Sequence, residues 1–285
     1  MSAPRPPAGG SAPRSPASPG PAAPATPAPR RSTPVGRGAA RFVAPGLVLL
    51  ALFAVWELIV RVGWVDELLL PAPTQIAQAL WEDRSLLAPD LWTTTFEVVL
   101  GLLASVVLGV GLAVAMHMVP AVDRALRPLA IGSQAVPIPV VAPLFVLVLG
   151  FGLAPKILII ALICFFPIVV NVSDGLRKSD ADARKLLRSL DASPWQRLRF
   201  LDGPSALPAG FTGLKIAAAV AVIGAVLAEW AGSDAGLGHI LVTANGQLET
   251  ARAFAATTLL IAEAIALYAL FAWLERRVVT WEPKT

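Results

Sequence analysis

The sequence predicts an all-α, polytopic membrane protein, and three observations support this fold class. Hydrophobic residues make up 56% of the 285 residues and charged residues only 15%, whereas soluble domains average about 45–50% and about 25%. The apolar residues cluster into stretches close to the roughly 20 residues that span a bilayer. Lys and Arg gather in alternate segments between those stretches, which is typical of a protein whose positive charges set its orientation.

Six transmembrane helices are predicted from the apolar stretches. They cover residues 42–60, 92–118, 129–149, 156–171, 206–230 and 253–274. Glycines occur within the second and fifth of these spans, Gly101 and Gly224 among them. Because glycine lets neighbouring backbones approach closely, we expect these two helices to pack in the interior of the bundle.

The spans divide the chain into a tail at 1–41, a first span with an outer loop at 42–91, a core at 92–274 and a second tail at 275–285. The first tail holds 11 of the 26 prolines and almost no large apolar side chain, which predicts disorder. In the outer loop, Thr74 is expected to cap a short amphipathic helix. A second outer loop, at 231–252, is Gly-rich and weakly apolar, which is compatible with a re-entrant or a surface-lying segment.

The distribution of positive charge predicts that both termini are cytoplasmic. With the N-terminus inside, 18 of the 23 Lys and Arg residues fall in inside segments and four in outside segments. Only Lys and Arg set topology, and Asp and Glu divide almost evenly. The net charge of +4 therefore reports orientation in the lipid bilayer, and no nucleic-acid partner is expected.

The inside loop at 172–204 is much longer than a connection between helices requires. Leucines recur in it at spacings of three to four residues, with Arg and Lys between them, which predicts two short amphipathic helices. Ser193 is expected to cap the second helix and Pro194 to occupy its first position. An apolar stripe of this kind can pack on its own bundle, lie in the lipid interface or insert into a partner.

This loop resembles the EAA loop of binding-protein-dependent ABC permeases. The sequence "LRSLDAS" is similar to the family's "SLGAS". The residues that match are Ala192, the two large apolar residues Leu198 and Leu201, and the closing Pro204. The residues that depart are Lys185, Leu186 and Leu187 in place of Glu-Ala-Ala, Asp191 in place of Gly, and Gly203 in place of Leu. Asp tolerates the left-handed backbone better than most residues, so we expect the turn to persist.

Longer matches cover about 42–274 and resemble the nitrate, sulfonate, taurine and pyrimidine-precursor branch of these permeases. They are "LPAPTQI", "VPIPVVAPLFVLVLGFGLAPK", "FFPIVVNVSDGL" and "GLKIAAAVAVIGAVLAEWAGSDAGLG". The resemblance implies a type I ABC importer permease fold in the cytoplasmic (inner) membrane, and a permease homodimer that works with two ATP-binding subunits and an extracytoplasmic substrate-binding protein. It also implies that the loop at 172–204 is a coupling helix. Its contact residues with the ATPase would be Leu190, Asp191, Ala192, Ser193, Pro194 and Trp195.

Motifs for chemistry within the chain itself do not occur. The sequence has no G-x-x-x-x-G-K-[ST], so the ATPase must be a separate subunit and the chain is not expected to be an enzyme. One cysteine and two histidines give no metal-ligand spacing, and no cofactor is implied. A membrane enzyme and an ion-coupled secondary transporter are rival readings, but the sequence shows neither catalytic motifs nor clear inverted repeats.

Three residues within the spans are candidates for the substrate path: Glu97, Pro139 and Glu263. Carboxylates in a membrane usually face a cavity or a partner, so each Glu either binds substrate or pairs within the bundle. Pro139 either kinks its helix or lines the path. Glu229, near the end of its span, is expected to be structural. A carboxylate in the path opposes an anion, which favours a thiamine-pathway pyrimidine or a similar ligand over nitrate, sulfonate or taurine.

Overall fold

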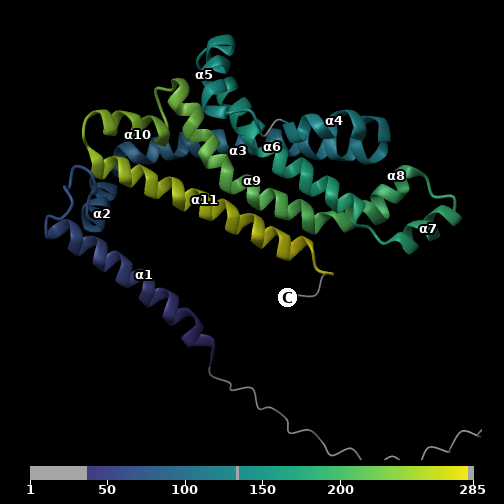
Figure 1. Cartoon of the computed structure of the whole chain (residues 1–285), viewed down its shortest axis with the longest axis horizontal. Helices are drawn as coiled ribbons and strands as arrows, with labels where there is room; N and C mark the ends of the chain where they lie inside the picture. The colour runs from purple at the N-terminus through teal and green to yellow at the C-terminus, as the bar shows by residue number, and fades with distance from the viewer. Residues whose placement is uncertain (1–36, 133–134, 282–285) are drawn as a thin grey trace, which may run out of the picture. The chain divides into compact units, whose positions relative to one another are not determined.

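The structure is a computed structural model, and it describes residues 37–132 and 135–281 (Figure 1). Every regular element of this described part is a helix, so the all-α prediction is confirmed there. The helices are α1 (Arg37–Arg61), α2 (Pro73–Glu82), α3 (Arg84–Met118), α4 (Pro120–Gly132), α5 (Ile138–Leu149), α6 (Leu153–Arg177), α7 (Ala181–Ser189), α8 (Pro194–Arg197), the π-helix η2 (Leu198–Asp202), α9 (Gly203–Gly232), α10 (Leu237–Gly246) and α11 (Thr250–Val278).

The chain divides into two units, and the boundary falls inside α1, after Leu49. The described part of the first unit is the beginning of α1, which contains residues 37–41 of the predicted tail. Residues 1–36 of that tail lie outside the described residues. The second unit, Leu50–Thr285, contains the rest of α1 and all the other helices named above.

Four helical segments in the described residues are long and apolar enough to cross a membrane. They are α3, α6, the continuous segment Pro194–Gly232 made of α8, η2 and α9, and α11. They contain the predicted spans 92–118, 156–171, 206–230 and 253–274. Each is longer than the apolar stretch that predicted it, because a helix continues past the hydrocarbon region into its polar flanks.

The predicted span at 129–149 is not one continuous helix, and this prediction was wrong in its extent. Within these limits α4 ends at Gly132 and α5 runs from Ile138 for only 12 residues. Pro137 precedes α5 with an extended backbone, at φ −73° and ψ 97°. Proline lacks an N–H and restricts the residue before it, so the Pro-rich stretch starts a new helix.

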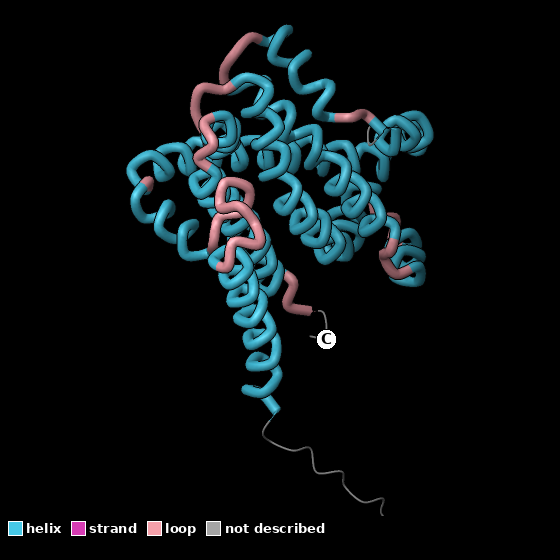
Figure 2. Tube along the Cα trace, turned by 60° about the vertical axis from the view of Figure 1, so that its left-hand side comes forward, coloured by secondary structure: helices cyan, strands magenta, loops and turns pink. Residues whose placement is uncertain are grey.

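Helix α6 packs against both α3 and α9 at the centre of the second unit. Figure 2 shows that the described part consists of helices joined by loops. Gly101 and Gly109 of α3 lie against Ile160 and Ile168 of α6. From the other side, Gly224 of α9 lies against the backbone of Ile160. The expectation that glycines place these helices in the bundle interior is confirmed, because a side chain at any of these positions would meet α6.

The two outer loops of the sequence both contain a helix. Helix α2 begins at Pro73, but Thr74 does not cap it: its backbone N–H and hydroxyl both donate to Glu57. The side chain of Gln75 instead accepts from the N–H of Ala72 at 2.8 Å. The loop at 231–252 contains α10, which buries Leu237, Gly238, Ile240 and Ala244.

Candidate functional site

The turn between α7 and α8 has the local structure that its sequence predicts. Ser193 accepts a hydrogen bond from Gln196 N, and Gln196 Oε1 accepts from Ser193 N at 2.7 Å, so a reciprocal capping box starts α8. Pro194 occupies the first turn. Asp191 has φ +54°, the left-handed backbone expected at this turn. Of the two short helices predicted for this loop, α7 is present as a separate helix, whereas the second is the start of a continuous helical segment that runs from α8 through η2 into α9.

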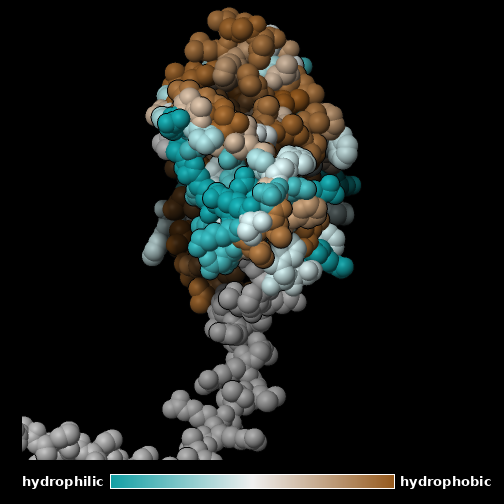
Figure 3. Space-filling view, turned by 90° about the vertical axis from the view of Figure 1, so that its right-hand side faces the viewer, coloured by the Kyte–Doolittle hydropathy of each residue, from teal (hydrophilic) through white to brown (hydrophobic). Residues whose placement is uncertain are grey.

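Four large apolar side chains along α7, α8 and η2 are exposed, whereas Leu198, at the start of η2, is buried in the core of the bundle. Leu190 is 68% exposed and Trp195 is 62% exposed, and Leu186 and Phe200 are also exposed. Of the six predicted docking residues, five are exposed and Ala192 is half-buried. Figure 3 views the molecule from the side on which α7 and α8 lie and shows hydrophilic surface interrupted by apolar residues. Exposed apolar residues on a solvated segment are typical of an interaction site.

A buried carboxylate fixes the base of this segment. Asp202, the last residue of η2, is 4% exposed and lies 2.9 Å from His117 Nε2 at the end of α3. Its other oxygen accepts from Ser179 Oγ at 2.5 Å and from Arg184 Nη2 at 2.9 Å. Arg184, on α7, also donates to Ser179 Oγ and to the carbonyl of Leu176. Asp202 therefore joins α3, α7 and the start of α9.

A second ion-pair cluster lies between α4 and the end of α6. Asp123 binds Arg127 in its own helix at 2.9 Å and Arg177 of α6 at 2.7 Å. The hydrogen bonds from the Arg127 and Arg177 guanidinium groups hold the pKa of the Asp123 carboxyl below its usual value. The cluster ties α4 to the helix that leads into α7.

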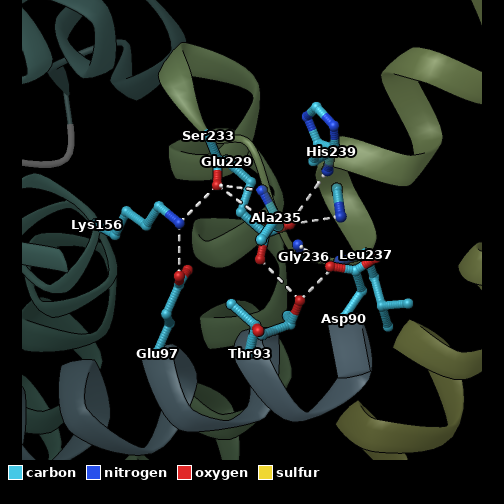
Figure 4. Close-up of polar contacts among 12 residues, drawn as sticks. Asp90, Thr93, Glu97, Lys156, Glu229, Ser233, Ala235, Gly236, Leu237 and His239 are labelled. Atoms are coloured by element: carbon cyan, nitrogen blue, oxygen red, sulfur yellow. Dashed lines mark hydrogen bonds and ion pairs between the residues drawn. The ribbon is translucent and has the colours of Figure 1, made fainter. Parts of the chain in front are cut away.

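At the other end of α9, Glu229 holds the entry to α10 (Figure 4). Glu229 is 2% exposed. Its Oε1 accepts from Thr94 Oγ1 of α3 at 2.7 Å, and its Oε2 accepts from the backbone N–H groups of Gly238 and His239. Thr94 Oγ1 in turn accepts from Leu237 N at 2.9 Å. The expectation of a structural role is confirmed, but Glu229 is buried and not solvated.

Two glycines make room for the Glu229 carboxylate. Gly236 has φ +109°, and a Cβ placed there would overlap the carboxylate itself. A Cβ at Gly238 would lie 2.7 Å from Glu229 Oε2 and 3.0 Å from Val226 Cα. The N–H of Gly236 also donates to Asp90 Oδ1 at 2.6 Å. The first turn of α10 is therefore held by α3 and α9 through its backbone.

Beside Glu229, a buried ion pair joins α3, α6 and the loop before α10. Lys156 Nζ lies 2.6 Å from Glu97 Oε1 and 2.6 Å from Ser233 Oγ, as Figure 4 shows. Glu97 and Lys156 are both buried. Of the two alternatives for Glu97, the structure shows the pairing within the bundle. From the sequence alone, Lys156 was counted among the outside positive charges, and no ion-pair partner was predicted for it.

The three predicted path residues occupy different settings. Glu263 on α11 is buried, and its carboxylate lies beside the side chain of Thr95 of α3 without a well-aligned hydrogen bond among the described residues. Pro139 is exposed in the first turn of α5, where a missing N–H costs nothing. Glu97 is bound to Lys156. A role in a common substrate path remains a prediction for all three.

The family of binding-protein-dependent transport system inner membrane components matches residues 105–280 of the chain. The formylaminopyrimidine transport permease protein ThiX of Halalkalibacterium halodurans is 35% identical over 84% of this chain and 96% of its own length. The riboflavin transport system permease protein RibX of Chloroflexus aurantiacus is 32% identical over 88% of this chain and 96% of its own length.

A solved structure shows the same fold. The inward-facing MetNI methionine ABC transporter aligns with a TM-score of 0.60 and 18% identity over 68% of this chain and 97% of the matched chain. The described helices, the matching family and the relatives agree with one another. The chain therefore belongs to the binding-protein-dependent transport system inner membrane component family and is a multi-pass ABC transporter permease of the inner membrane.

Proposed function

We propose that this chain is the membrane subunit of an ABC importer and that α7 and α8 form the coupling helix that docks a separate ATPase. The observation that carries the proposal is the exposure of Leu190 and Trp195 on a segment whose base is fixed by buried hydrogen bonds. A coupling helix transmits motion only if it is held rigidly, and the hydrogen bonds of Asp202 attach the α7–α8 segment to α3 and to the start of α9.

The charge around α8 supports an acidic partner surface. A cavity of about 190 Å³ lies under α8 and is lined by residues that include Arg184, Arg188, Pro194, Arg197 and Asp202. Arg184 is bound to Asp202, so Arg188 and Arg197 leave positive charge beside the exposed apolar residues. A partner with an apolar groove rimmed by carboxylates would complement both features.

The rest of the assembly follows from the same proposal. The permease has six spans, with α1 and the region of α4 and α5 adding to the four long helices, and both termini lie in the cytoplasm. It works as a homodimer with two ATPases, and an extracytoplasmic binding protein delivers the substrate at the end that contains α2 and α10. The excess of Lys and Arg in the segments around α7 supports this orientation.

Co-purification of the native complex tests the docking role. We expect wild-type protein to retain an ATPase and the double variant Trp195→Ala, Leu190→Asp to lose it, because apolar anchors dominate such interfaces. Trp230→Ala is a matched control, since Trp230 is 55% exposed at the opposite end of α9. An ATPase that stays bound to the double variant would show that α7 and α8 do not dock it.

For the substrate, we propose a small, neutral heteroaromatic molecule of the thiamine-pathway pyrimidine type. The only lysines in the four long helical segments of the described structure are Lys156 and Lys215, and each binds a carboxylate, Glu97 at 2.6 Å and Glu275 at 2.7 Å. The arginines of these segments all lie near the helix ends and leave the middle of each segment without an unpaired cation. A path for nitrate, sulfonate or taurine would need an unpaired cation or equivalent donors.

ATP-dependent uptake of a formylaminopyrimidine, but not of taurine, by the reconstituted complex would support this substrate class. Uptake driven by an ion gradient without ATP would favour the secondary-transporter alternative.

A further inference from the structure

Two cavities adjoin along one face of α6. The first has a volume of about 380 Å³ and lies between α5, α6 and α9, within the range of about 300–1,000 Å³ typical of small-molecule sites. The second, of about 300 Å³, continues toward the end of α6 that leads to α7. Phe166 and Val170 line both cavities. The positions that line them recur every three to four residues, so they share one side of the helix.

The first cavity is apolar and carries no charged residue. Its lining includes Ile138, Ile163, Phe166, Pro167, Asn171 and Ile216. An aromatic ring and branched aliphatic side chains form a surface on which a flat ring can stack. A sulfonate would be desolvated there without a compensating charge, which is costly.

Polar groups are available along the same face. Asn171 Nδ2 donates to the carbonyl of Pro167 at 2.8 Å, which leaves the amide a second N–H and an oxygen for other partners. Pro167 has no N–H, so the carbonyl of Ile163 receives no helical bond from that position. In the second cavity, Ser173 is buried and its hydroxyl has no hydrogen-bond partner among the residues that the structure describes. Most buried side-chain hydroxyl groups in folded proteins have a hydrogen-bond partner, so this one is unusual.

We propose that the first cavity binds the neutral, planar heteroaromatic ring of the transported molecule, with Phe166 and Asn171 as the residues that recognise it. The inference rests on the proposed importer function and assigns a place to its substrate. Phe166 stacks on the ring, and the Asn171 amide pairs with a ring nitrogen or an exocyclic group. Ser173 receives the molecule in the second cavity after it passes the wall that Phe166 and Val170 form.

Transport by the complete complex, with its ATPase and binding protein in lipid vesicles, tests this assignment. The probes are a formylaminopyrimidine and riboflavin, with taurine as the charged comparison. We expect Phe166→Leu and Asn171→Leu each to lower ring uptake by about fivefold or more, since one stacking contact is worth about that factor. The matched control is Phe96→Leu, the same change at an exposed residue of α3 that lines neither cavity.

A thiol reagent locates the ring directly. Cys164 is the only cysteine and is fully buried, so Val170→Cys in a Cys164→Ala background gives a single reactive thiol in the cavity wall. We expect the formylaminopyrimidine to slow its reaction with N-ethylmaleimide and taurine to leave the rate unchanged. Val107→Cys, at an exposed position on α3, should react at the same rate with or without either probe.

The outcomes separate this inference from the proposed function. ATP-driven ring uptake that is the same in wild type, Phe166→Leu and Asn171→Leu would overturn the binding site and leave the importer role standing. Labelling at position 170 that the ring does not slow would do the same and would indicate a lipid-filled cavity. Wild-type complex that takes up neither ring would overturn the substrate class and this inference together.

Discussion

A buried carboxylate holds each end of α9, but the groups that donate hydrogen bonds to it differ between the two ends. Each end has a buried carboxylate that reaches α3: Asp202 contacts His117 and Glu229 contacts Thr94. Asp202 otherwise binds side chains, from Ser179 and Arg184, whereas Glu229 binds the backbone N–H groups of α10. Side-chain donors can move while they stay bonded, but backbone donors move only with their helix. Both ends are therefore firmly held, the α7 end through side chains and the α10 end through its backbone, and we expect the α10 end to be the more rigid of the two.

The ion pair at the α10 end gives the largest expected effect. Lys156→Met leaves Glu97 buried without its countercharge, and we expect it to lower the free energy of unfolding by about 3–5 kcal/mol. Thermal unfolding of the detergent-solubilised protein measures the change. The double variant Glu97→Leu, Lys156→Met removes both charges and should recover most of the stability. Equal losses in the single and double variants would mean that packing, and not charge, holds this end.

Gly236 tests the rigidity of the entry to α10. Gly236→Ala places a methyl group against the Glu229 carboxylate at a φ of +109°, and we expect a loss of about 3 kcal/mol from strain and overlap combined. The control is Gly246→Ala at the far end of α10, where a Cβ meets no atom within 4 Å. Hydrogen exchange should accelerate in α10 of the first variant only. An unchanged rate there would contradict the claim that backbone bonds hold this helix.

A substitution at Asp202 tests the α7 end of α9, which we expect to be the less rigid of the two ends. Asp202→Asn weakens charge-assisted bonds to His117 and Arg184, and we expect a loss of about 2 kcal/mol, less than at Lys156, because Arg184 is partly solvated. Faster hydrogen exchange in α7 but not in α10 would be the specific result. Asp182→Asn, an exposed change in α7, should have no measurable effect. Faster hydrogen exchange in both α7 and α10 would contradict the claim that the two ends of α9 are held by separate contacts.

The smallest effect is expected at the cap of α8. Ser193→Ala removes the side-chain acceptor of the capping box, at a cost of about 1 kcal/mol to the helix. Weaker binding of the ATPase, measured by titration of the solubilised permease, would follow if a preformed α8 is needed for docking. Ser189→Ala serves as the control, since Ser189 lies at the end of α7 and bonds only within it. Unchanged binding in Ser193→Ala would show that α8 forms on contact with its partner.

Local chemistry explains why parts of this fold were predictable from sequence. The long spans follow from runs of apolar residues, and the turn before α8 follows from Asp191, Ser193 and Pro194, whose preferences act over a few residues. Thr74 was assigned the wrong role because its hydroxyl bonds to Glu57, which lies 17 residues away. A cap predicted from sequence assumes that no distant acceptor competes.

The network at the α10 end was not predicted, because its bonds join residues that are distant in sequence. Glu229 and Thr94 are separated by 135 residues, and Lys156 and Glu97 by 59. Proximity to the end of a span indicated a solvated Glu229, whereas the folded chain buries it under α10. The nearest available indication was the pair Gly236 and Gly238, since glycines that follow a carboxylate closely can leave space for it.

The glycine contacts on α6 also limit how this part of the chain can evolve. Ile160 lies between Gly101 of α3 and Gly224 of α9, and it is fully buried. A smaller residue at position 160 would open a void toward both neighbours, and a larger one would collide with both. Tolerated replacements therefore need matching changes on two other helices at once. Among relatives, position 160 should vary less than Leu147 of α5, which is exposed and can exchange with any apolar residue.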